Sequence, residues 1–176
     1  MQKGLDTLAL LGISGVLLVA FYYQFVIGEL PCPLCALQRV GFILAGIALM
    51  LNLRVGYSPA HYGIALLSAV AAGAASLRQI SLHVIPNTGH YGSALFGFHF
   101  YTWAFVGYGA LVVYIGAMLL LAREAPERGR EAPAGALATI ACWLFLGLCL
   151  ANAVAFFAEC GMGPCPDNPT GYLFKL

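Results

Sequence analysis

Two cysteines separated by two residues are the feature of this sequence with the clearest chemistry. Cys32 and Cys35 lie in the segment Cys-Pro-Leu-Cys, after one apolar stretch and before another. If Cys35 falls in the first turn of the next helix, unpaired backbone N–H groups and the helix dipole favour a thiolate there. Arg39, four residues later, would lie on the same helix face and add a positive charge. Thiolates exchange disulfides, so the pattern indicates a redox centre.

The same cysteine spacing also occurs in structural disulfides and in halves of zinc sites. A disulfide that spans two residues restricts the unfolded chain very little, so a purely stabilising role is weakly motivated. A zinc site would need further ligands, and Cys160 and Cys165 could complete a set of four thiolates with Cys32 and Cys35. Arg39 argues against zinc, because a positive side chain brings no advantage beside a metal cation. A metal-binding membrane protein is nevertheless the alternative reading.

The composition of the chain is that of a membrane protein. Of the 176 residues, 61% are hydrophobic and only 9% are charged, and the mean hydropathy is +0.88. The formal net charge is +1, and the sequence contains no run of Lys or Arg that could bind along a phosphate backbone. We therefore expect membrane lipid as a partner and no nucleic acid.

Five charge-poor stretches are long enough to cross a bilayer, whose core of about 30 Å needs roughly 20 helical residues. They cover residues 7–27, 35–53, 60–80, 100–122 and 134–158, and a tail over residues 159–176 follows. Proline, glycine and charged residues occupy the breaks between them. The sequence thus predicts an all-α polytopic membrane protein, a single integral membrane domain in which a four-helix core precedes a fifth transmembrane helix.

Basic residues near the ends of the spans predict the orientation, because they favour the cytoplasm. With the N-terminus inside, the inner basic residues are Lys3, Arg54, Arg123, Arg128 and Arg130, and the outer ones are Arg39, Arg78 and Lys175. We therefore expect a cytoplasmic N-terminus and a periplasmic C-terminus. The Cys32/Cys35 turn, the loop over residues 81–99 and the tail with Cys160 and Cys165 would then share the outer, oxidising side.

Residues 32–39, CPLCALQR, lie between the first two spans and resemble the signature of the DsbB (disulfide bond formation protein B) family. Arg78 and Gln79, at the outer end of the third span, also resemble that family's pattern. The resemblance covers roughly residues 5–122. It implies an oxidoreductase of the bacterial inner membrane that forms disulfides. Such an enzyme passes electrons from a periplasmic thioredoxin-like dithiol oxidase to a membrane quinone, either ubiquinone or menaquinone.

The resemblance also implies roles for individual residues. Cys35 would face the quinone, and Cys32 would be its disulfide partner and exchange with a second cysteine pair. Arg39 would polarise the quinone carbonyl and stabilise the reduced oxygen, a role that its charge also allows. Gln38 stands where the family often has an acidic residue, and we assign it with Arg78 to the quinone site.

Histidines surround the loop before the fourth span. His90 and His99 are candidates for the quinone site, because quinone reduction consumes two protons and imidazole titrates near neutral pH. His83 is close to them in the sequence, but no metal-ligand motif accompanies the three. The glycine- and phenylalanine-rich segment over residues 91–100 could roof a channel for the quinone tail, or it could be ordinary interfacial packing.

The chain departs from the family pattern in its second cysteine pair. Members of the family carry that pair between the third and fourth spans, whereas residues 83–93 contain no cysteine. The fifth span would deliver Cys160 and Cys165 to the same outer face instead. We hypothesise that these two form a disulfide that relays electrons from a soluble thiol protein to Cys32 and Cys35. A structural disulfide that closes a short tail loop is the alternative.

The remaining cysteines lie within the fifth span. Cys142 and Cys149 are about 10 Å apart along a helix, so they cannot pair with each other. We expect them to be small apolar side chains. A carrier of reducing power across the membrane would need a reactive pair on the inner face, and the sequence shows none.

Overall fold

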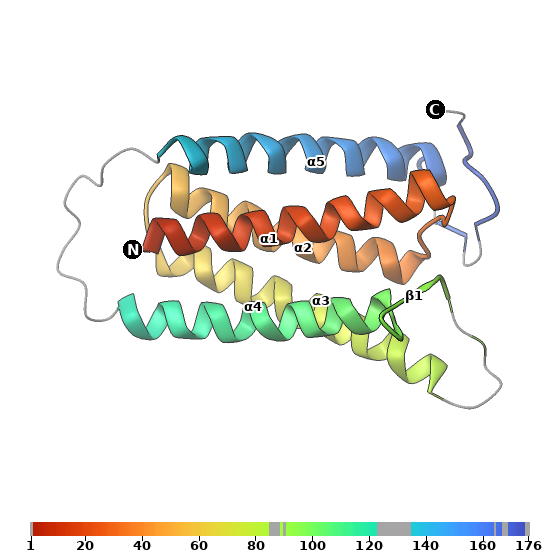
Figure 1. The fold of residues 1–176 in the computed structure, drawn as a ribbon, viewed down its shortest axis with the longest axis horizontal. Coiled ribbons are helices and arrows are strands. Elements are labelled where there is room, and N and C mark those ends of the chain that lie inside the picture. Colours follow the sequence, from red (N-terminus) through yellow and green to blue (C-terminus); the bar gives the residue numbers. More distant parts are fainter. Residues whose placement is uncertain are drawn as a thin grey trace.

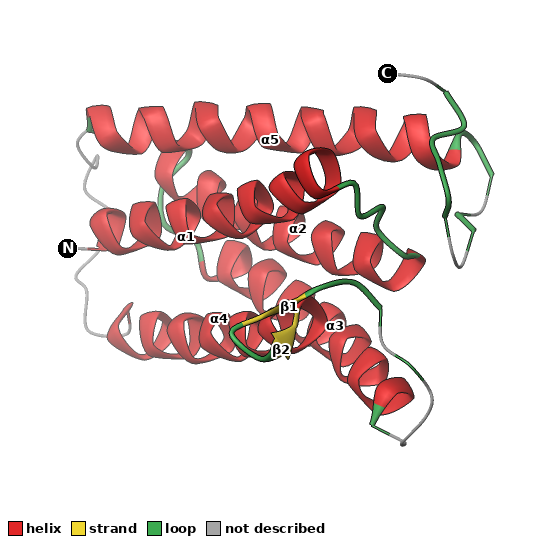
Figure 2. Cartoon of the chain, turned by 45° about the vertical axis from the view of Figure 1, so that its right-hand side comes forward, coloured by secondary structure: helices red, strands yellow, loops and turns green. Residues whose placement is uncertain are grey.

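The computed structural model describes residues 2–84, 89, 91–122, 135–163, 165–166 and 169–174. Within these residues it contains five long helices and a short hairpin (Figures 1 and 2). The helices are α1 (Gln2–Tyr22), α2 (Pro33–Arg54), α3 (Pro59–His83), α4 (Phe100–Ala122) and α5 (Ala136–Cys160). A π-helical turn, η1 (Tyr23–Ile27), continues α1, and the antiparallel strands β1 (Ala94–Leu95) and β2 (Phe98–His99) precede α4.

Each of the five helices is long and apolar enough to cross a membrane, if α1 and η1 are taken as one segment. The predicted fold class, an all-α polytopic membrane protein with a fifth helix, is therefore confirmed. The first helix begins at Gln2 rather than at residue 7. Asp6 does not end the span, because its carboxylate is buried and accepts hydrogen bonds from the hydroxyls of Tyr62 and Tyr114. Hydropathy alone treats such a carboxylate as the edge of a span.

The helices lie side by side, so that functional segments gather at one end of the bundle (Figure 1). The N-terminus lies at the end where α4 finishes and α5 begins. The turn between η1 and α2, the hairpin and the tail after α5 lie at the other end, which we call the cysteine end. The three segments that the sequence predicted to share a face are thus together.

Helix α2 is the central element, because it contacts α1, α3, α4 and α5. Fully buried alanines on α2 and α3 allow these two helices to approach closely. Gly46 of α2 faces the buried ring of Phe145 on α5, and a Cβ atom at this position would overlap that ring. The absence of a side chain at Gly46 therefore permits α5 to dock against α2.

Gly46→Ala is expected to lower the thermal unfolding midpoint in detergent, because overpacking a tight contact costs about 1–3 kcal/mol. Gly63→Ala on α3 is the matched control, since an added Cβ there meets nothing within 4 Å. The control should leave the midpoint unchanged or raise it, because alanine favours a helix over glycine by about 1 kcal/mol. Equal midpoints for the two variants would contradict this account of α5 docking.

Candidate functional site

The first turn of α2 holds the Cys32–Cys35 disulfide, whose Cα atoms are 4.9 Å apart. Cys32 is the N-cap, and its Sγ atom accepts a hydrogen bond from the backbone N–H of Cys35 at 3.1 Å. Pro33 follows at the first helical position, where a missing N–H costs nothing. Cys35 thus lies in the first turn of the helix. The side chain of Cys32 is only 6% exposed, whereas Cys35 is half-buried.

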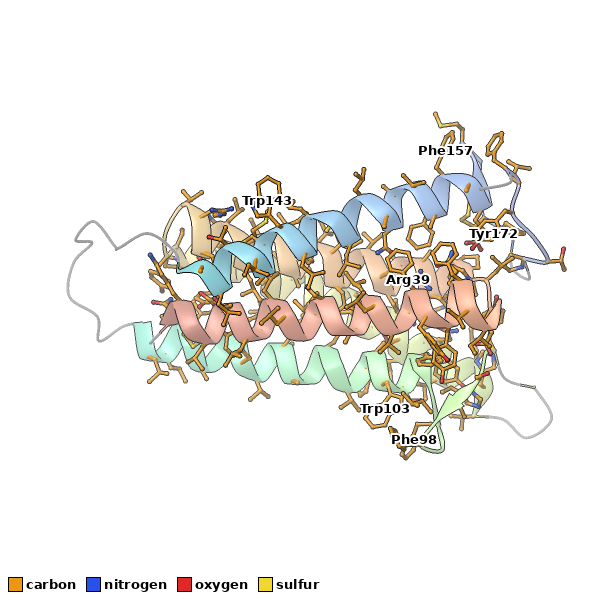
Figure 3. All side chains as sticks on the ribbon, turned by 45° about the horizontal axis from the view of Figure 1, so that its top comes forward. Arg39, Phe98, Trp103, Trp143, Phe157 and Tyr172 are labelled. Carbon is orange, nitrogen blue, oxygen red and sulfur yellow. A yellow bond between two sulfur atoms is a disulfide. The ribbon has the colours of Figure 1, made fainter. Side chains whose placement is uncertain are left out.

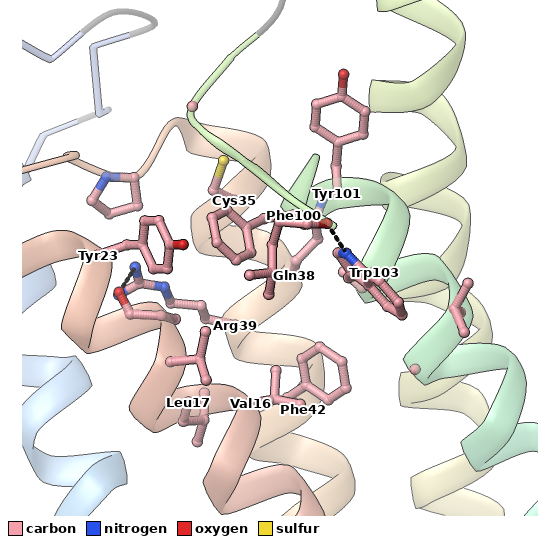
Figure 4. A pocket seen from close by; sticks show the side chains of 18 of the residues that line it. Val16, Leu17, Tyr23, Cys35, Gln38, Arg39, Phe42, Phe100, Tyr101 and Trp103 are labelled. Carbon is pink, nitrogen blue, oxygen red and sulfur yellow. Dashed lines mark hydrogen bonds between the residues drawn. The ribbon is translucent and has the colours of Figure 1, made fainter. Parts of the chain in front are cut away.

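An apolar cavity of about 560 Å³ lies beside this disulfide, between α1, η1, α2 and α4 (Figure 4). The polar groups and rings of its lining include Cys35, Gln38 and Arg39 from α2, Tyr23 from η1, and Phe100 and Trp103 from α4. A second cavity of about 420 Å³ continues between α1 and α4 and shares Gly12, Val16 and Phe42 with the first. Together they form an elongated apolar groove with its polar groups at the cysteine end.

Arg39 is held in place by groups from α1 and η1. One guanidinium nitrogen donates to the Gln24 side-chain oxygen at 2.5 Å, and the other donates to the Ala20 carbonyl at 3.2 Å. The guanidinium carbon also lies 5.8 Å from the ring centroids of Phe21 and Phe156. Among the described residues, no carboxylate forms a direct ion pair with Arg39.

The π-helical turn η1 places Gln24 beside Arg39. Gln24 is 2% exposed, and its amide nitrogen donates to the Tyr172 hydroxyl in the tail at 3.2 Å. Gly28 ends η1 in the left-handed region, with φ at +82°, which favours glycine. A single π-turn shifts the face that later residues present, and such turns are frequent at functional sites. A three-way link therefore joins the tail, η1 and Arg39.

Gln79 of α3 contacts both sulfurs of the disulfide. Its amide nitrogen lies 3.3 Å from Cys32 Sγ and 3.6 Å from Cys35 Sγ, and the side chain is 2% exposed. Gln38 donates to the Gln79 side-chain oxygen at 2.8 Å, which fixes the amide with its nitrogen toward the sulfurs. The Tyr108 hydroxyl in turn donates to the Gln38 carbonyl. Because an N–H donor stabilises a nearby anion, this arrangement would favour a thiolate after reduction.

Residues 91–93, which we call the covering segment, lie at the cysteine end of the cavity, where Tyr91 and Gly92 form part of its lining. Glu29 accepts hydrogen bonds from the Ser93 backbone N–H at 3.1 Å and from the Ser93 hydroxyl, and Tyr91 donates to the Leu30 carbonyl at 2.6 Å. Burial raises the pKa of the Tyr91 phenol, and the negative charges of Glu159 and Glu29 add to this effect. The phenol therefore stays neutral and keeps donating this hydrogen bond at physiological pH.

The tail carries a second disulfide, between Cys160 and Cys165, with the Cα atoms 4.7 Å apart. The backbone N–H of Phe174 donates to the Ala158 carbonyl at 2.9 Å, and the Phe174 ring stacks on Phe157 at 5.5 Å. The tail thus folds back along the end of α5. Two further cysteines of α5, Cys142 and Cys149, are free thiols as expected.

Several predicted site residues lie elsewhere. Arg78 is exposed on α3 and does not line the cavity, because neighbouring helix residues point about 100° apart and Gln79 takes the inward direction. His99 is also absent from the lining; its ring stacks on Tyr101 at 5.3 Å, and His83 lies at the same distance from Tyr101. His90 lies outside the described residues.

The zinc alternative finds no support. Cys32, Cys35, Cys160 and Cys165 form two separate disulfides rather than one cluster of thiolates. In the part of the chain that the structure describes, no group of three or more His, Cys, Asp or Glu side chains could hold a metal ion.

Sequence reasoning missed Gln24 and assigned no function to Gln79. Gln24 is a polar residue near the end of an apolar span, and intramembrane polar residues often have a function, so a signal was present. Glu29 follows the first predicted span, and the sequence indicated no role for it, whereas it accepts hydrogen bonds from Ser93 of the covering segment. The contact between Gln79 and the sulfurs had no sequence signal beyond its place beside Arg78.

Comparison with known proteins identifies the family of this chain. Residues 2–90 match the family model described as disulfide bond formation protein DsbB. The chain belongs to the DsbB family. Disulfide bond formation protein B of Marinobacter nauticus is 42% identical over 83 residues, which cover 45% of this chain and 49% of that protein. The protein of the same name from Stutzerimonas stutzeri is 34% identical over 90 residues, or 48% and 54% of the two chains.

The chain spans about half the length of the curated relatives that it matches. No solved structure matches it. The DsbB match includes α1, η1, α2 and α3, and with them the Cys32–Cys35 disulfide, Arg39 and Gln79. Helices α4 and α5 and the tail disulfide lie beyond the matched residues. The chain is thus a multi-pass membrane protein of the DsbB family.

Proposed function

We propose that this protein is a quinone-dependent thiol oxidase that forms disulfides. A dithiol gives up two electrons and two protons and becomes a disulfide. The quinone, when bound, accepts the two electrons and two protons and leaves as quinol. The observation that carries the proposal is that Cys35 and Arg39 line one apolar cavity at the end of α2.

The cavity has the character of a quinone site. Its walls are largely apolar, its volume of about 560 Å³ falls within the usual range for small-molecule pockets, and it continues along α1 and α4. An isoprenoid tail is apolar and elongated, as this groove is. Arg39 supplies the positive charge that a quinone oxygen would need during reduction. Either ubiquinone or menaquinone is compatible with these features.

The residues around Cys35 would prepare its sulfur for the reaction. The N-terminus of α2 and the charge of Arg39 stabilise a thiolate at Cys35 once the disulfide is reduced. Gln79 donates toward the same sulfur, and Gln38 holds Gln79 in that orientation. Tyr91 and Glu29 hold the covering segment against the cysteine end of the cavity.

Electrons would reach Cys32 and Cys35 from the tail. In each exchange a thiolate attacks one sulfur to form a mixed disulfide, and the other sulfur leaves as a thiolate. The second thiolate of the donor pair then attacks the mixed disulfide, so that the donor becomes a disulfide and two electrons pass to the acceptor pair. A periplasmic thioredoxin-like dithiol protein would reduce Cys160–Cys165, and this pair would then reduce Cys32–Cys35. Because Cys32 is buried, the exchange requires the turn before α2 to open. The basic residues near the span ends support an orientation with the cysteine end at the periplasmic face of the bacterial inner membrane and the N-terminus in the cytoplasm.

The proposal is tested with the purified protein in detergent, dithiothreitol as the electron donor and a short-chain ubiquinone as the acceptor. We expect one quinol for each dithiothreitol oxidised, at a rate proportional to protein concentration. Thiol loss without quinol formation, or a rate equal to that without protein, would contradict the proposal. Assays under argon exclude oxidation by oxygen.

Gln24→Ala is expected to slow quinone reduction about tenfold or more. Gln24 accepts a charge-assisted hydrogen bond from Arg39, and such bonds contribute about 1.5–3 kcal/mol. The KM for quinone should rise as well, because the guanidinium loses its fixed orientation. Gln2→Ala, which removes an amide at the opposite end of α1, is the control and should retain the wild-type rate. Identical kinetics for the two variants would rule out the positioning role of Gln24.

A further inference from the structure

Glu159 is a buried carboxylate at the cysteine end. It lies in the last turn of α5, beside Cys160, and its side chain is 4% exposed. Both carboxylate oxygens are buried and have no hydrogen-bond partner within the described residues. The C-terminal end of a helix is also an unfavourable place for a negative charge. A buried polar group without partners costs free energy, so its presence calls for a functional explanation.

The charged and titratable groups around Glu159 come from α2, from the covering segment and from the tail. Arg39 of α2 and Tyr91 of the covering segment each interact electrostatically with Glu159. Tyr172 of the tail interacts with the same Arg39, while η1 contributes the uncharged Gln24. Figure 3 shows Arg39 between α1 and α5, toward the end of the bundle where Tyr172 lies. The carboxylate and the guanidinium therefore influence each other through space, without the direct contact of an ion pair.

Arg39 contacts both the cavity and α5, the helix that carries Glu159. The cavity lining includes Arg39 but not Glu159, and the cation–π contact with Phe156 places the guanidinium against the last turns of α5. An ionised Glu159 partly cancels the positive potential that Arg39 creates in the cavity. A proton on Glu159 removes this cancellation. The attraction of Arg39 for negative charge at the Cys35 sulfur thus depends on whether Glu159 carries a proton.

We infer that Glu159 is a positioning residue that adjusts the positive potential of Arg39 in the cavity. When negative charge forms in the cavity, Glu159 takes up a proton. This inference rests on the proposed function, in which Cys35 becomes a thiolate and the quinone is reduced beside Arg39. It assigns to α5, which lies beyond the residues matched by the family, an electrostatic role in addition to carrying the tail disulfide. The carboxylate does not line the cavity, and the attraction of Arg39 is what favours its charged form.

The test measures the Cys35 thiolate directly and needs no quinone. Protein carrying Cys160→Ala and Cys165→Ala is reduced, and the alkylation rate of Cys35 by iodoacetamide is followed against pH by peptide mass spectrometry. Glu159→Gln has nearly the same shape but no charge. We expect its thiolate fraction below the alkylation midpoint to be about threefold to tenfold higher than that of the parent protein, with the midpoint at lower pH.

Two further variants separate tuning from a structural role. Glu159→Asp keeps the charge and should restore the parent pH profile. Combined with Arg39→Met, Glu159→Gln should shift the profile much less than it does alone, because the buried Glu159 stays protonated without the positive charge of Arg39 and there is no charge left to remove. A Glu159→Gln profile that matches the parent, or a shift of equal size without Arg39, would overturn the inference. Failure of the quinone assay with the thiolate shift intact would instead count against the oxidase function alone.

Discussion

Cys35→Ser is expected to abolish quinone reduction, with a loss on the order of 10³-fold or more. The hydroxyl cannot form the disulfide with Cys32, and at neutral pH it supplies no thiolate beside Arg39. Cys35 is also the only one of the two cysteines that lines the cavity among the described residues. The measurement is quinol formation by the purified variant, with dithiothreitol as the donor.

A matched cysteine variant controls for the loss of a sulfur atom. Cys149 is a free, half-buried thiol in α5 and takes part in neither disulfide. Cys149→Ser should therefore retain close to the wild-type rate. If Cys35→Ser kept more than about a tenth of the activity, another group would have to transfer the electrons, and the account of the cavity would be wrong.

Removal of the tail disulfide is expected to lower the rate with a protein electron donor but not the rate with dithiothreitol. The double variant Cys160→Ala, Cys165→Ala should lose most of its activity with a reduced thioredoxin-like protein, by about 100-fold or more, because a protein donor cannot reach the buried Cys32. It should keep quinone reduction with dithiothreitol, because a small dithiol can enter when the turn before α2 opens. Both rates are measured on the same preparation.

The double variant Cys142→Ala, Cys149→Ala is the control, since it also removes two sulfurs from the C-terminal part of the chain. It should retain both activities. An unchanged rate with the protein donor after loss of Cys160 and Cys165 would make the tail disulfide structural. Loss of both activities in the tail variant, with normal unfolding, would show that the tail positions Arg39 through Tyr172 and Gln24 rather than relaying electrons.

The sequence predicted the parts of the fold that depend on hydropathy and spacing. Five apolar stretches and the breaks between them were enough for the class of fold, and the helical period placed Cys35 and Arg39 on one side of α2. The direction in which a side chain points relative to the neighbouring helices was not predictable. Whether Arg78 or Gln79 faces the disulfide depends on how α3 packs against α2, and the sequence motif contains both residues.

Two further residues, Gln24 and Glu159, were not predicted at the site, for local physical reasons. Gln24 reaches Arg39 through a π-helical turn, and a regular helical period does not predict such a turn. Glu159 was treated as the boundary of a span, because charged residues usually leave the membrane at that point. It is buried, however, and interacts with Arg39 of α2 and with Tyr91 of the loop before α4. Contacts between segments so far apart in the sequence are set by packing, which one sequence does not reveal.

A single-turnover reaction tests the central claim most directly, that the Cys32–Cys35 pair passes its electrons to a quinone. Protein lacking the tail pair is reduced without oxygen, freed of reductant and mixed with one equivalent of short-chain ubiquinone. Quinol is then measured, and free thiols are counted by alkylation and mass spectrometry. The account predicts one quinol per chain, with Cys32 and Cys35 both converted to the disulfide. Quinone left unreduced, while both thiols remain free, would contradict it.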